Sequence, residues 1–306
     1  RKGPVVASKS ERIGVVGLGN MGGPLARHLL QAGFAVRGYD TRREAIEPLV
    51  ASGGEAGSSP ADLAASCPIV FTSLPSVAAL EAVVEGPEGL ASTAGAGSVV
   101  VETSTLPLAT KERARDALAA AGAATLDCPL SGTASQMEVR DIAVYASGDK
   151  EAIDRCRPAL AAFSRALYEV GEFGNGIRLK LVANHLVTVH NVAAAEALLL
   201  ARRSGLDGEL ARRALCDGAG MSRMLEVRGP MMLSGDFSHA NMRLEYYQKD
   251  IDLINAQARA VKCLLPLFSV SSQLYLAALA QGRLDEDAAD VYAVLEGMHE
   301  PPHAAG

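Results

Sequence analysis

The amino-acid sequence predicts an α/β domain with a doubly wound, mostly parallel sheet, followed by an all-α domain. Short β-rich runs alternate with Ala- and Leu-rich runs up to about residue 172, and no convincing strand follows Gly174. A long apolar run over 176–203, without proline, then predicts a helix that joins the two halves. We therefore expect a first domain over 12–174 and a helical second domain over 175–303.

Each predicted element follows from its composition and from the turns that bound it. Strands are expected where β-branched and aromatic residues cluster, at 13–19, 34–40, 68–75, 97–105, 124–132, 142–149 and 166–172. The helices between them are expected at 23–32, 42–51, 60–66, 107–121 and 150–163. In the second domain we expect helices near 208–217, 221–233, 241–262, 265–281 and 285–298.

Composition excludes several classes of protein. The 306 residues are 49% hydrophobic and 21% charged, which is enough for a large core and suggests two domains. The net charge is −6 and no stretch is dense in Lys or Arg, so we expect no nucleic-acid partner. No uncharged apolar run is long enough to cross a bilayer, so we expect no membrane partner either.

The cysteines and the first residues indicate where the protein works. The N-terminal segment 1–12 has basic residues but no apolar signal core, and we expect it to be a disordered leader or a remnant of recombinant expression. The cysteines show neither disulfide nor zinc spacing, so reduced thiols and a cytoplasmic protein are expected. They are five in number and widely scattered: Cys67, Cys128, Cys156, Cys216 and Cys263.

A glycine-rich segment follows the first predicted strand and opens the first predicted helix. In this context a G-x-G-x-x-G pattern is typical of a dinucleotide site. The first glycine allows the tight turn, the second lets backbone N–H groups approach a pyrophosphate, and the third lets the helix pack close to the strand. Taken alone, the same pattern would be an ordinary turn. The predicted cofactor-binding residues are Gly17, Leu18, Gly19, Asn20, Met21 and Gly22.

Asp40 ends the second predicted strand, 21 residues after Gly19. A carboxylate at this place accepts hydrogen bonds from ribose hydroxyls and repels a 2′-phosphate, which favours NAD. Arg42 and Arg43 follow, and an arginine there can instead hold the 2′-phosphate of NADP. The alternative is that both arginines are solvated at a helix start. We therefore predict NAD, with NADP as the second choice, and include Asp40, Thr41 and Arg42 in the cofactor site.

The long helix is apolar on nearly every face, so we expect it to be buried on nearly every face. Lys180 lies within it, where a charge is costly. Asn184 and Asn191 follow on the same helical face. A desolvated lysine can have its pKa lowered enough to act as a general acid and base near neutral pH. The alternative is that Lys180 extends to solvent or pairs with a buried carboxylate. The helix pattern does not decide between these readings.

Other groups of reactive side chains give little indication of a catalytic or metal site. Ser131 has no His and Asp at a recognisable spacing, so a hydrolase triad is not expected. His185 and His190 do not share a helix face, and packing or the rim of a pocket explains them better than metal binding. Glu296 and His299 have a metal-like spacing, but they precede two prolines and are expected in a solvated tail. No metal site is predicted.

Four motifs together resemble the β-hydroxyacid dehydrogenase family, which includes 3-hydroxyisobutyrate dehydrogenases, tartronate semialdehyde reductases and L-threonate dehydrogenases. The motifs match in order and spacing over nearly the whole chain, from about Ile13 to Met298. They are GLGNMG at 17–22, DCPLSGT at 127–133, GNGIRLKLVAN at 174–184 and QKDI at 248–251. The resemblance implies a Rossmann-type domain, NAD(P)-dependent oxidoreduction of a small carboxylate substrate, and a homodimer or homotetramer.

The resemblance also implies roles for particular residues. Lys180 matches the catalytic lysine, and Asn184 matches an amide that orients the substrate. The turn that binds the substrate carboxylate corresponds to Ser131, Gly132 and Thr133. Besides the glycine-rich segment, the implied cofactor contacts are Leu74, Pro75, Thr105 and Lys249, the last reaching back from the helical domain.

The chain departs from the family pattern at four places. Thr133 replaces the second glycine of a Ser-Gly-Gly turn, and Arg140 begins a segment that often reads Gly-Thr-Leu. Ala79 and His185 stand where the family commonly has asparagine. These departures bear on which substrate is used and not on the lysine.

The expected reaction is hydride transfer between nicotinamide and a small 3-hydroxy carboxylate, or reduction of the matching semialdehyde, with Lys180 as acid and base. One alternative is an imine reductase on the same scaffold. The other is a catalytically silent dinucleotide-binding scaffold. Relatives of both kinds lack the lysine, so Lys180 argues against them.

Overall fold

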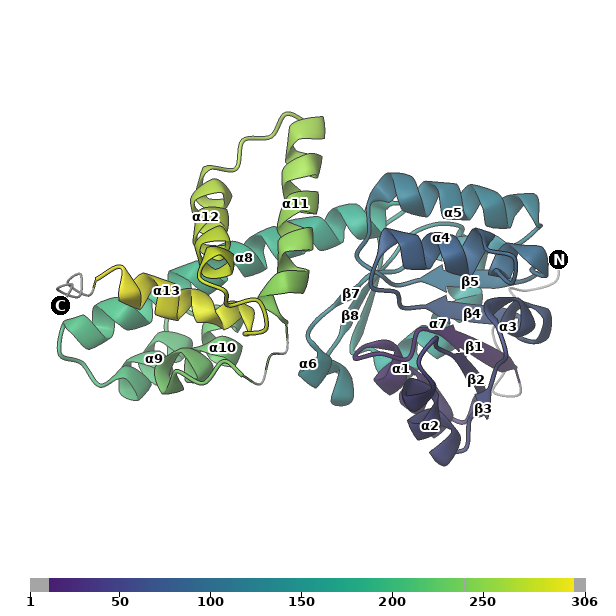
Figure 1. Cartoon of the computed structure of the whole chain (residues 1–306), viewed down its shortest axis with the longest axis horizontal. Helices are drawn as coiled ribbons and strands as arrows, with labels where there is room; N and C mark the ends of the chain where they lie inside the picture. Colours follow the sequence, from purple (N-terminus) through teal and green to yellow (C-terminus); the bar gives the residue numbers. More distant parts are fainter. Residues whose placement is uncertain (1–10, 239, 241, 300–306) are drawn as a thin grey trace. The chain divides into compact units, whose positions relative to one another are not determined.

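The computed structural model describes residues 11–238, 240 and 242–299, so most of the expected leader, residues 1–10, lies outside the described residues. The chain divides into two compact units, Arg1–Lys180 and Leu181–Gly306. This division falls inside the long helix, whereas the predicted domain boundary lies just before the helix begins. The first unit is α/β and the second is all-helical, as the sequence predicts (Figure 1).

The first unit is built on a six-stranded parallel sheet with the order β3-β2-β1-β4-β5-β6. The chain adds strands outward from β1 on one side and then, from β4, on the other, so the order reverses between β1 and β4. A reversal of this kind opens a crevice at the carboxyl ends of the strands, where ligands bind in open α/β sheets. The strands are β1 (Arg12–Val16), β2 (Ala35–Tyr39), β3 (Glu55–Ala56), β4 (Ile69–Thr72), β5 (Val99–Glu102) and β6 (Ala124–Asp127).

Helices cover both faces of this sheet, because neighbouring residues of each central strand point to opposite sides. Ile69 and Phe71 of β4 pack into one core cluster, while Val70 packs into the other. The first cluster includes residues of α1 (Gly22–Gln31) and α7 (Lys150–Phe163). On the opposite face are α3 (Pro60–Ser66), α4 (Val77–Glu85) and α5 (Leu108–Ala120), while α2 (Arg43–Ala51) follows β2. A short 3-10 helix, η1 (Leu90–Ser92), follows α4.

Helix α4 is absent from the sequence prediction. Ser76 caps it, accepting a hydrogen bond from the Ala79 N–H at 3.2 Å. A serine three residues before that N–H is a helix-start signal in the sequence.

The single strand predicted over 124–132 is wrong. Its residues form β6 and then β7 (Leu130–Ser131), which belongs to a separate three-stranded sheet with β8 (Ala143–Ala146) and β9 (Ala166–Glu169). Strand β7 pairs antiparallel with β8, and β8 pairs parallel with β9. Pro129 lies between β6 and β7, and a proline has no N–H with which to continue the ladder. The chain therefore leaves the large sheet there.

The second unit begins within α8 (Asn175–Arg203), which starts in the first unit. It continues with α9 (Gly208–Asp217), α10 (Arg223–Ser234), α11 (Leu244–Ala260), α12 (Pro266–Ala280), the 3-10 helix η2 (Ala288–Asp290) and α13 (Val291–Gly297). Buried polar contacts hold α8 against its neighbours. Thr188 Oγ1 lies 2.8 Å from the Tyr247 hydroxyl of α11, and Asn191 Nδ2 donates to the Tyr275 hydroxyl of α12 at 2.8 Å.

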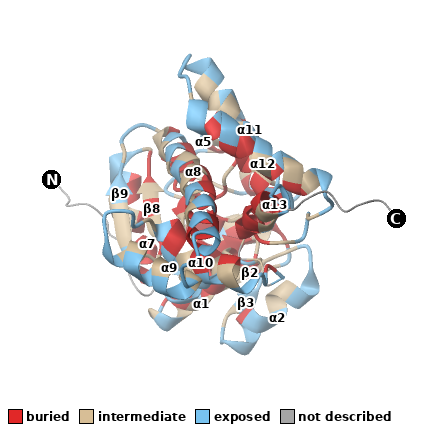
Figure 2. Ribbon diagram, turned by 90° about the vertical axis from the view of Figure 1, so that its left-hand side faces the viewer, coloured by how far each residue is buried: buried red, intermediate tan, exposed pale blue. Residues whose placement is uncertain are grey.

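The expectation that α8 is buried on nearly every face is wrong for the single chain. Val182, Leu186 and Leu200 are exposed, and the helix shows both buried and exposed residues along its length (Figure 2). The polar stripe is the buried side: Lys180, Asn184 and Asn191 are 7%, 5% and 0% exposed. Apolar periodicity alone cannot separate a side chain buried inside one chain from one left uncovered on its surface.

Candidate functional site

The predicted cofactor residues of the first unit gather at one edge of the large sheet. Parallel strands all end at the same edge, so the turns after β1, β2, β4 and β5 lie together there. The glycine-rich turn 17–22 follows β1 and Leu74 follows β4, on either side of the point where the strand order reverses. A Cβ added to Gly17 would lie 2.2 Å from the Ser73 carbonyl oxygen, which shows how close the two turns are.

The three glycines of this turn differ in what surrounds them. Gly17 has φ +88°, in the left-handed region that favours glycine. A Cβ at Gly22 would lie 1.8 Å from the Gly17 carbonyl oxygen, so helix and strand approach each other too closely for a side chain. At Gly19, however, the nearest atom to an added Cβ is Arg42 Nη2, 3.7 Å away. The second glycine therefore faces open space, as a backbone cradle for a pyrophosphate requires.

The start of α1 adds to this cradle. Its N-cap residue Met21 makes no side-chain capping hydrogen bond. The first N–H groups of a helix without such a cap are suited to an anion. These observations fit a dinucleotide at the predicted position.

Asp40, just after β2, holds the glycine-rich turn by a hydrogen bond. Its Oδ2 accepts the Leu18 N–H at 2.8 Å, and its Oδ1 accepts the Arg42 N–H at 2.9 Å. The Arg42 Nε lies 3.3 Å from Oδ1. Burial raises the pKa of Asp40, but the hydrogen bonds from Arg42 and Leu18 outweigh burial and leave that pKa below its usual value. The carboxylate is thus charged at neutral pH and lies directly beside the glycine-rich turn.

The predicted nicotinamide side of the site follows β4 and β5. Leu74 N–H donates to Ser104 Oγ at 2.8 Å, which joins the two turns. Thr105 is half-buried at the next position after Ser104, and Pro75 follows Leu74. The sequence-predicted residues Leu74, Pro75 and Thr105 are thus brought to the edge that holds the glycine-rich turn.

The predicted carboxylate-binding turn connects β7 with α6 (Ala134–Glu138). Gly132 has φ +148°, and a Cβ there would lie 2.4 Å from Ile142 Cδ1, so the turn requires glycine. Thr133 caps α6: its Oγ1 accepts the Gln136 N–H at 3.4 Å, and its own N–H donates to Gln136 Oε1 at 3.0 Å. This capping box explains why a threonine rather than a second glycine stands at the start of this helix.

Lys180 is buried about one turn after a tightly held helix start. Asp127 Oδ2 accepts the Ile177 N–H at 2.8 Å, and Ser147 Oγ accepts the Gly176 N–H at 3.0 Å. A Cβ on Gly176 would lie 2.6 Å from the Asp127 carbonyl oxygen, so α8 begins directly against the end of β6. A carboxylate at a helix N-terminus also interacts favourably with the helix dipole. The first turn of α8 is thereby tied to the carboxyl edge of the sheet.

In the second unit, Asp250 brings two of the predicted residues together. Its Oδ2 accepts a hydrogen bond from Asn184 Nδ2 at 2.8 Å, and its Oδ1 accepts one from Lys249 Nζ at 2.8 Å. Asp250 is 5% exposed, and a buried charge needs a partner. Lys249 supplies that partner. Because the amide nitrogen of Asn184 is held by Asp250, its side-chain orientation is set.

His185, next along α8, packs its ring against Phe268 with centroids 5.4 Å apart. Burial, and secondarily the charge of His190, lowers the pKa of His185. The ring is therefore neutral at neutral pH. Among the described residues, no group of three or more His, Cys, Asp and Glu side chains could hold a metal ion.

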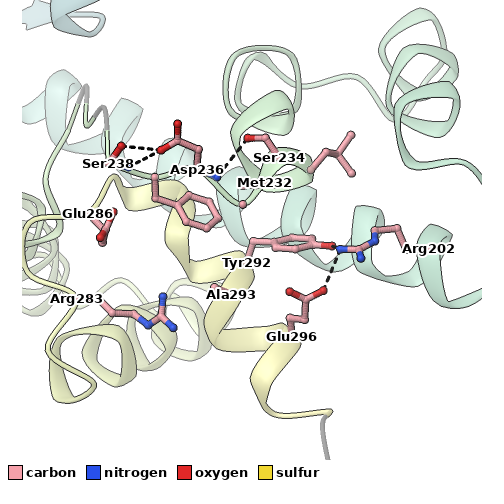
Figure 3. A pocket seen from close by; sticks show the side chains of 13 residues that line it. Arg202, Met232, Ser234, Asp236, Ser238, Arg283, Glu286, Tyr292, Ala293 and Glu296 are labelled. Carbon is pink, nitrogen blue, oxygen red and sulfur yellow. Dashed lines mark hydrogen bonds and ion pairs between the residues drawn. The ribbon is translucent and has the colours of Figure 1, made fainter.

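A hollow of about 500 Å³ in the second unit contains none of the predicted site residues (Figure 3). Its basic side chains already have acidic partners: Arg202 donates to Glu296 at 2.9 Å, and Arg283 donates to Asp290 at 2.8 Å. Acidic groups lie beside them, so the hollow does not present a surplus of positive charge to an anion.

Sequence reasoning missed several residues of the site. Asp127 and Asp250 lie inside the quoted motifs but have no role in the sequence prediction, and Lys111 does not enter it at all. Lys111 and Asp250 lie in helices that carry several other charged residues, so only their contacts in the folded chain mark them. In the described part of the chain, no helix is long and apolar enough to cross a membrane, and the five cysteines are free thiols.

Comparison with known proteins follows the same division of the chain. Residues 12–171 match the family model described as the NAD binding domain of 6-phosphogluconate dehydrogenase. Residues 174–295 match the model described as the NAD-binding domain of NADP-dependent 3-hydroxyisobutyrate dehydrogenase. The chain belongs to the β-hydroxyacid dehydrogenase family. It is an NAD(P)-dependent oxidoreductase of that family, acting on small hydroxy acids.

Individual members of the family resemble the chain over nearly its whole length. L-threonate dehydrogenase from Cupriavidus necator is 33% identical, with 96% of this chain and 99% of that protein covered. 2-(Hydroxymethyl)glutarate dehydrogenase from Eubacterium barkeri is 31% identical, with 95% and 96% covered. The crystal structure of 3-hydroxyisobutyrate dehydrogenase from Salmonella typhimurium superposes with a TM-score of 0.84 at 30% identity, covering 93% of this chain and 100% of that one. The predicted family and fold are confirmed.

Proposed function

We propose that this β-hydroxyacid dehydrogenase uses NAD to oxidise a small 3-hydroxy carboxylate, or reduces the matching semialdehyde, with Lys180 as general acid and base. One observation supports this most directly. Lys180 is 7% exposed, about one turn beyond the helix start that Asp127 holds against the sheet edge. The dinucleotide cradle lies at the same edge, so the amine is fixed within the unit that binds the cofactor.

The chemistry divides between cofactor and protein. When bound, the nicotinamide accepts a hydride from the carbinol carbon or returns it to the carbonyl carbon. In oxidation, the Lys180 amine takes the hydroxyl proton as the carbon–oxygen double bond forms. In the reverse direction, the Lys180 ammonium gives that proton to the developing alkoxide and stabilises its negative charge. Asn184, one turn further along α8 and held by Asp250, orients the substrate.

The substrate carboxylate is assigned to the turn 131–133. The Thr133 N–H already donates to Gln136 Oε1, so the donors we assign are the Ser131 hydroxyl and the Gly132 N–H. Thr133 then shapes the turn by capping α6 and does not bind the anion through its own N–H. A tight turn that presents N–H groups can hold a small anion, which supports the assignment of the Gly132 N–H, and the Ser131 hydroxyl would add a second donor.

The preference for NAD over NADP rests on the charged Asp40. Asp40→Asn is expected to lower the ratio of NADPH to NADH dissociation constants about 10-fold or more, because repulsion of the 2′-phosphate is removed. The amide oxygen can still accept the Leu18 N–H, while the –NH₂ group then faces the Arg42 N–H. Fluorescence titration of the wild type and the variant with both cofactors measures the ratio. An unchanged ratio would show that Asp40 does not select the cofactor.

Turnover assays test the proposed function as a whole. NADH and NADPH absorbance is followed with 3-hydroxyisobutyrate, glycerate and tartronate semialdehyde, threonate, a sulfonate analogue and a cyclic imine. We expect NAD-linked turnover of at least one hydroxy acid or its semialdehyde, and none of the imine. Reduction of the imine alone would support an imine reductase. Cofactor binding without any turnover would support a non-catalytic scaffold.

We also propose a homo-oligomer, a homodimer or a homotetramer. Exposed apolar side chains on the helical unit support it, since large uncovered apolar surfaces are typical of interaction sites. They include Val182, Leu186 and Leu200 on α8 and Leu267, Val270 and Leu276 on α12. Light scattering coupled to size-exclusion chromatography gives the mass in solution, and a monomer would contradict this proposal.

A further inference from the structure

Three charged side chains are buried together where β5 and β6 end. Glu102 and Asp127 are register partners at the ends of these strands, and Lys111 comes from α5. The Lys111 Nζ lies 2.6 Å from Glu102 Oε2 and 2.6 Å from Asp127 Oδ1. All three side chains are at most 3% exposed. Burial lowers the pKa of Lys111, but the two carboxylates outweigh burial and raise it above its ordinary value, so the amine is protonated.

One ammonium between two carboxylates leaves a net negative charge that backbone N–H groups compensate. Glu102 Oε1 accepts the Ser104 N–H at 2.8 Å, and Asp127 Oδ2 accepts the Ile177 N–H at 2.8 Å. Each carboxylate therefore faces Lys111 with one oxygen and a backbone N–H with the other. The second oxygen of Asp127 also accepts the Ser147 hydroxyl at 3.2 Å.

The two backbone contacts lead to different parts of the proposed site. On the Glu102 side, Ser104 Oγ accepts the Leu74 N–H at 2.8 Å. The hydrogen bonds from Glu102 therefore reach the turn that we predict to line the cofactor path. On the Asp127 side, the hydrogen bond reaches the Ile177 N–H in the first turn of α8, three residues before Lys180. A single buried ammonium thus joins the loops around the cofactor to the helix that bears the lysine.

We propose that Lys111 is a positioning residue: by holding Asp127 Oδ1, it directs Oδ2 at the Ile177 N–H and so sets the placement of Lys180. This inference rests on the proposed function of Lys180. Lys111 takes no part in proton or hydride transfer. Its role is to hold Asp127 in one orientation, because without the ammonium the buried Asp127 Oδ1 would lose its partner and the carboxylate would be free to turn.

Asp127→Asn tests the proposal with little change of shape. An amide has one oxygen, so either Lys111 or the Ile177 N–H must face an –NH₂ group. We expect the first turn of α8 to loosen and the reaction to slow, while the cofactor cradle after β1 is untouched. The expected loss in the rate of hydride transfer is about 10- to 100-fold, the scale of a small misplacement of a reacting group.

Asp62→Asn is a matched control. Asp62 also bridges a cation and a backbone N–H: it accepts from Arg37 at 2.9 Å through each of its oxygens, and its Oδ2 accepts the Ser58 N–H at 2.8 Å. The same substitution there changes a similar bridge in the same unit, although the Asp62 side chain is 30% exposed and that of Asp127 is fully buried. It lies in α3, which packs mainly against η1, β1 and β2, so we expect normal hydride transfer in this variant.

Two readouts separate positioning from a general loss of stability. The single-turnover rate is measured with the substrate that the turnover assays identify. Because this rate is expressed per NADH-binding site, unfolded molecules do not contribute to it. Hydrogen–deuterium exchange of segment 175–180 needs no substrate. For Asp127→Asn we expect a slower rate, unchanged NADH affinity and faster exchange. A rate per NADH-binding site equal to the wild type, or the same loss in Asp62→Asn, would overturn the proposal.

Adding Lys111→Met to Asp127→Asn provides the rescue test. Without the ammonium, the amide oxygen introduced at position 127 is free to accept the Ile177 N–H, and the new –NH₂ group can donate towards Glu102. We expect exchange at 175–180 and the hydride-transfer rate to recover at least in part, whereas independent destabilisation would make the double variant worse. Failure of the proposed function is seen separately, as full turnover by Lys180→Ala. The exchange measurement then still decides whether Lys111 and Asp127 hold the helix start.

Discussion

Replacing Lys180 by alanine is expected to lower kcat by roughly 10²- to 10⁴-fold, the usual contribution of general acid–base catalysis. The dissociation constant of NADH should change little, because the glycine-rich turn and Asp40 are left intact. Lys180 is buried, so the variant loses an amine that bulk water does not readily replace. Steady-state kinetics with the preferred substrate, together with NADH titration, measures the two effects separately.

Two further measurements show whether the proton-transferring amine is responsible. Lys180→Arg keeps a positive charge but cannot release its proton near neutral pH, so we expect it to be nearly as slow as the alanine variant. Small primary amines added to Lys180→Ala should restore part of the rate, since they can fill the space left by the side chain. Full turnover by Lys180→Ala would remove Lys180 from the mechanism, and full turnover by Lys180→Arg would limit its role to charge.

Changing Gly19 to alanine is expected to weaken NADH binding by about 10- to 100-fold, equivalent to roughly one charge-assisted hydrogen bond. The protein itself has room for the new methyl group, because the nearest atom to an added Cβ is Arg42 Nη2 at 3.7 Å. The space is what the pyrophosphate requires, so the loss should appear in affinity and not in thermal stability. Fluorescence titration and a melting curve of the same sample measure both.

Gly22→Ala is the contrasting variant in the same turn. Its Cβ would lie 1.8 Å from the Gly17 carbonyl oxygen, so the backbone of the turn must move whether or not a cofactor is present. We expect a clear fall in melting temperature together with lost binding. If Gly19→Ala bound NADH normally, or if it lost stability as Gly22→Ala does, the cradle would not lie at Gly19.

Much of the fold follows from local sequence signals. The parallel strands are short apolar runs followed by turns, and the glycine-rich segment marks the first crossover. Helix α9 begins and ends where the sequence predicts, at 208 and 217, because Asp207 caps it and Gly218 ends it. Lys180 stood out because charge is rare in an apolar helix, and the structure confirms that it is buried.

The parts that sequence reasoning missed depend on contacts between distant segments. The turn at Pro129 divides one apolar run between two sheets, and strand pairing is a non-local property. Lys111 lies in a helix whose other charged residues are mostly solvated, so its burial could not be read from periodicity. Asp250 likewise gains its role only when α11 packs against α8. Residues that hold the site in place are therefore harder to find than those at its centre.

The buried group of Glu102, Lys111 and Asp127 constrains how this enzyme can change over generations of mutation. Removing Lys111 alone leaves two buried carboxylates without their cation, at a cost of roughly 3–5 kcal/mol, whereas exchanging the whole buried set for well-packed apolar residues is often neutral. A survey of single replacements should therefore mark Lys111 as intolerant, while libraries that vary all three positions jointly should recover folded alternatives.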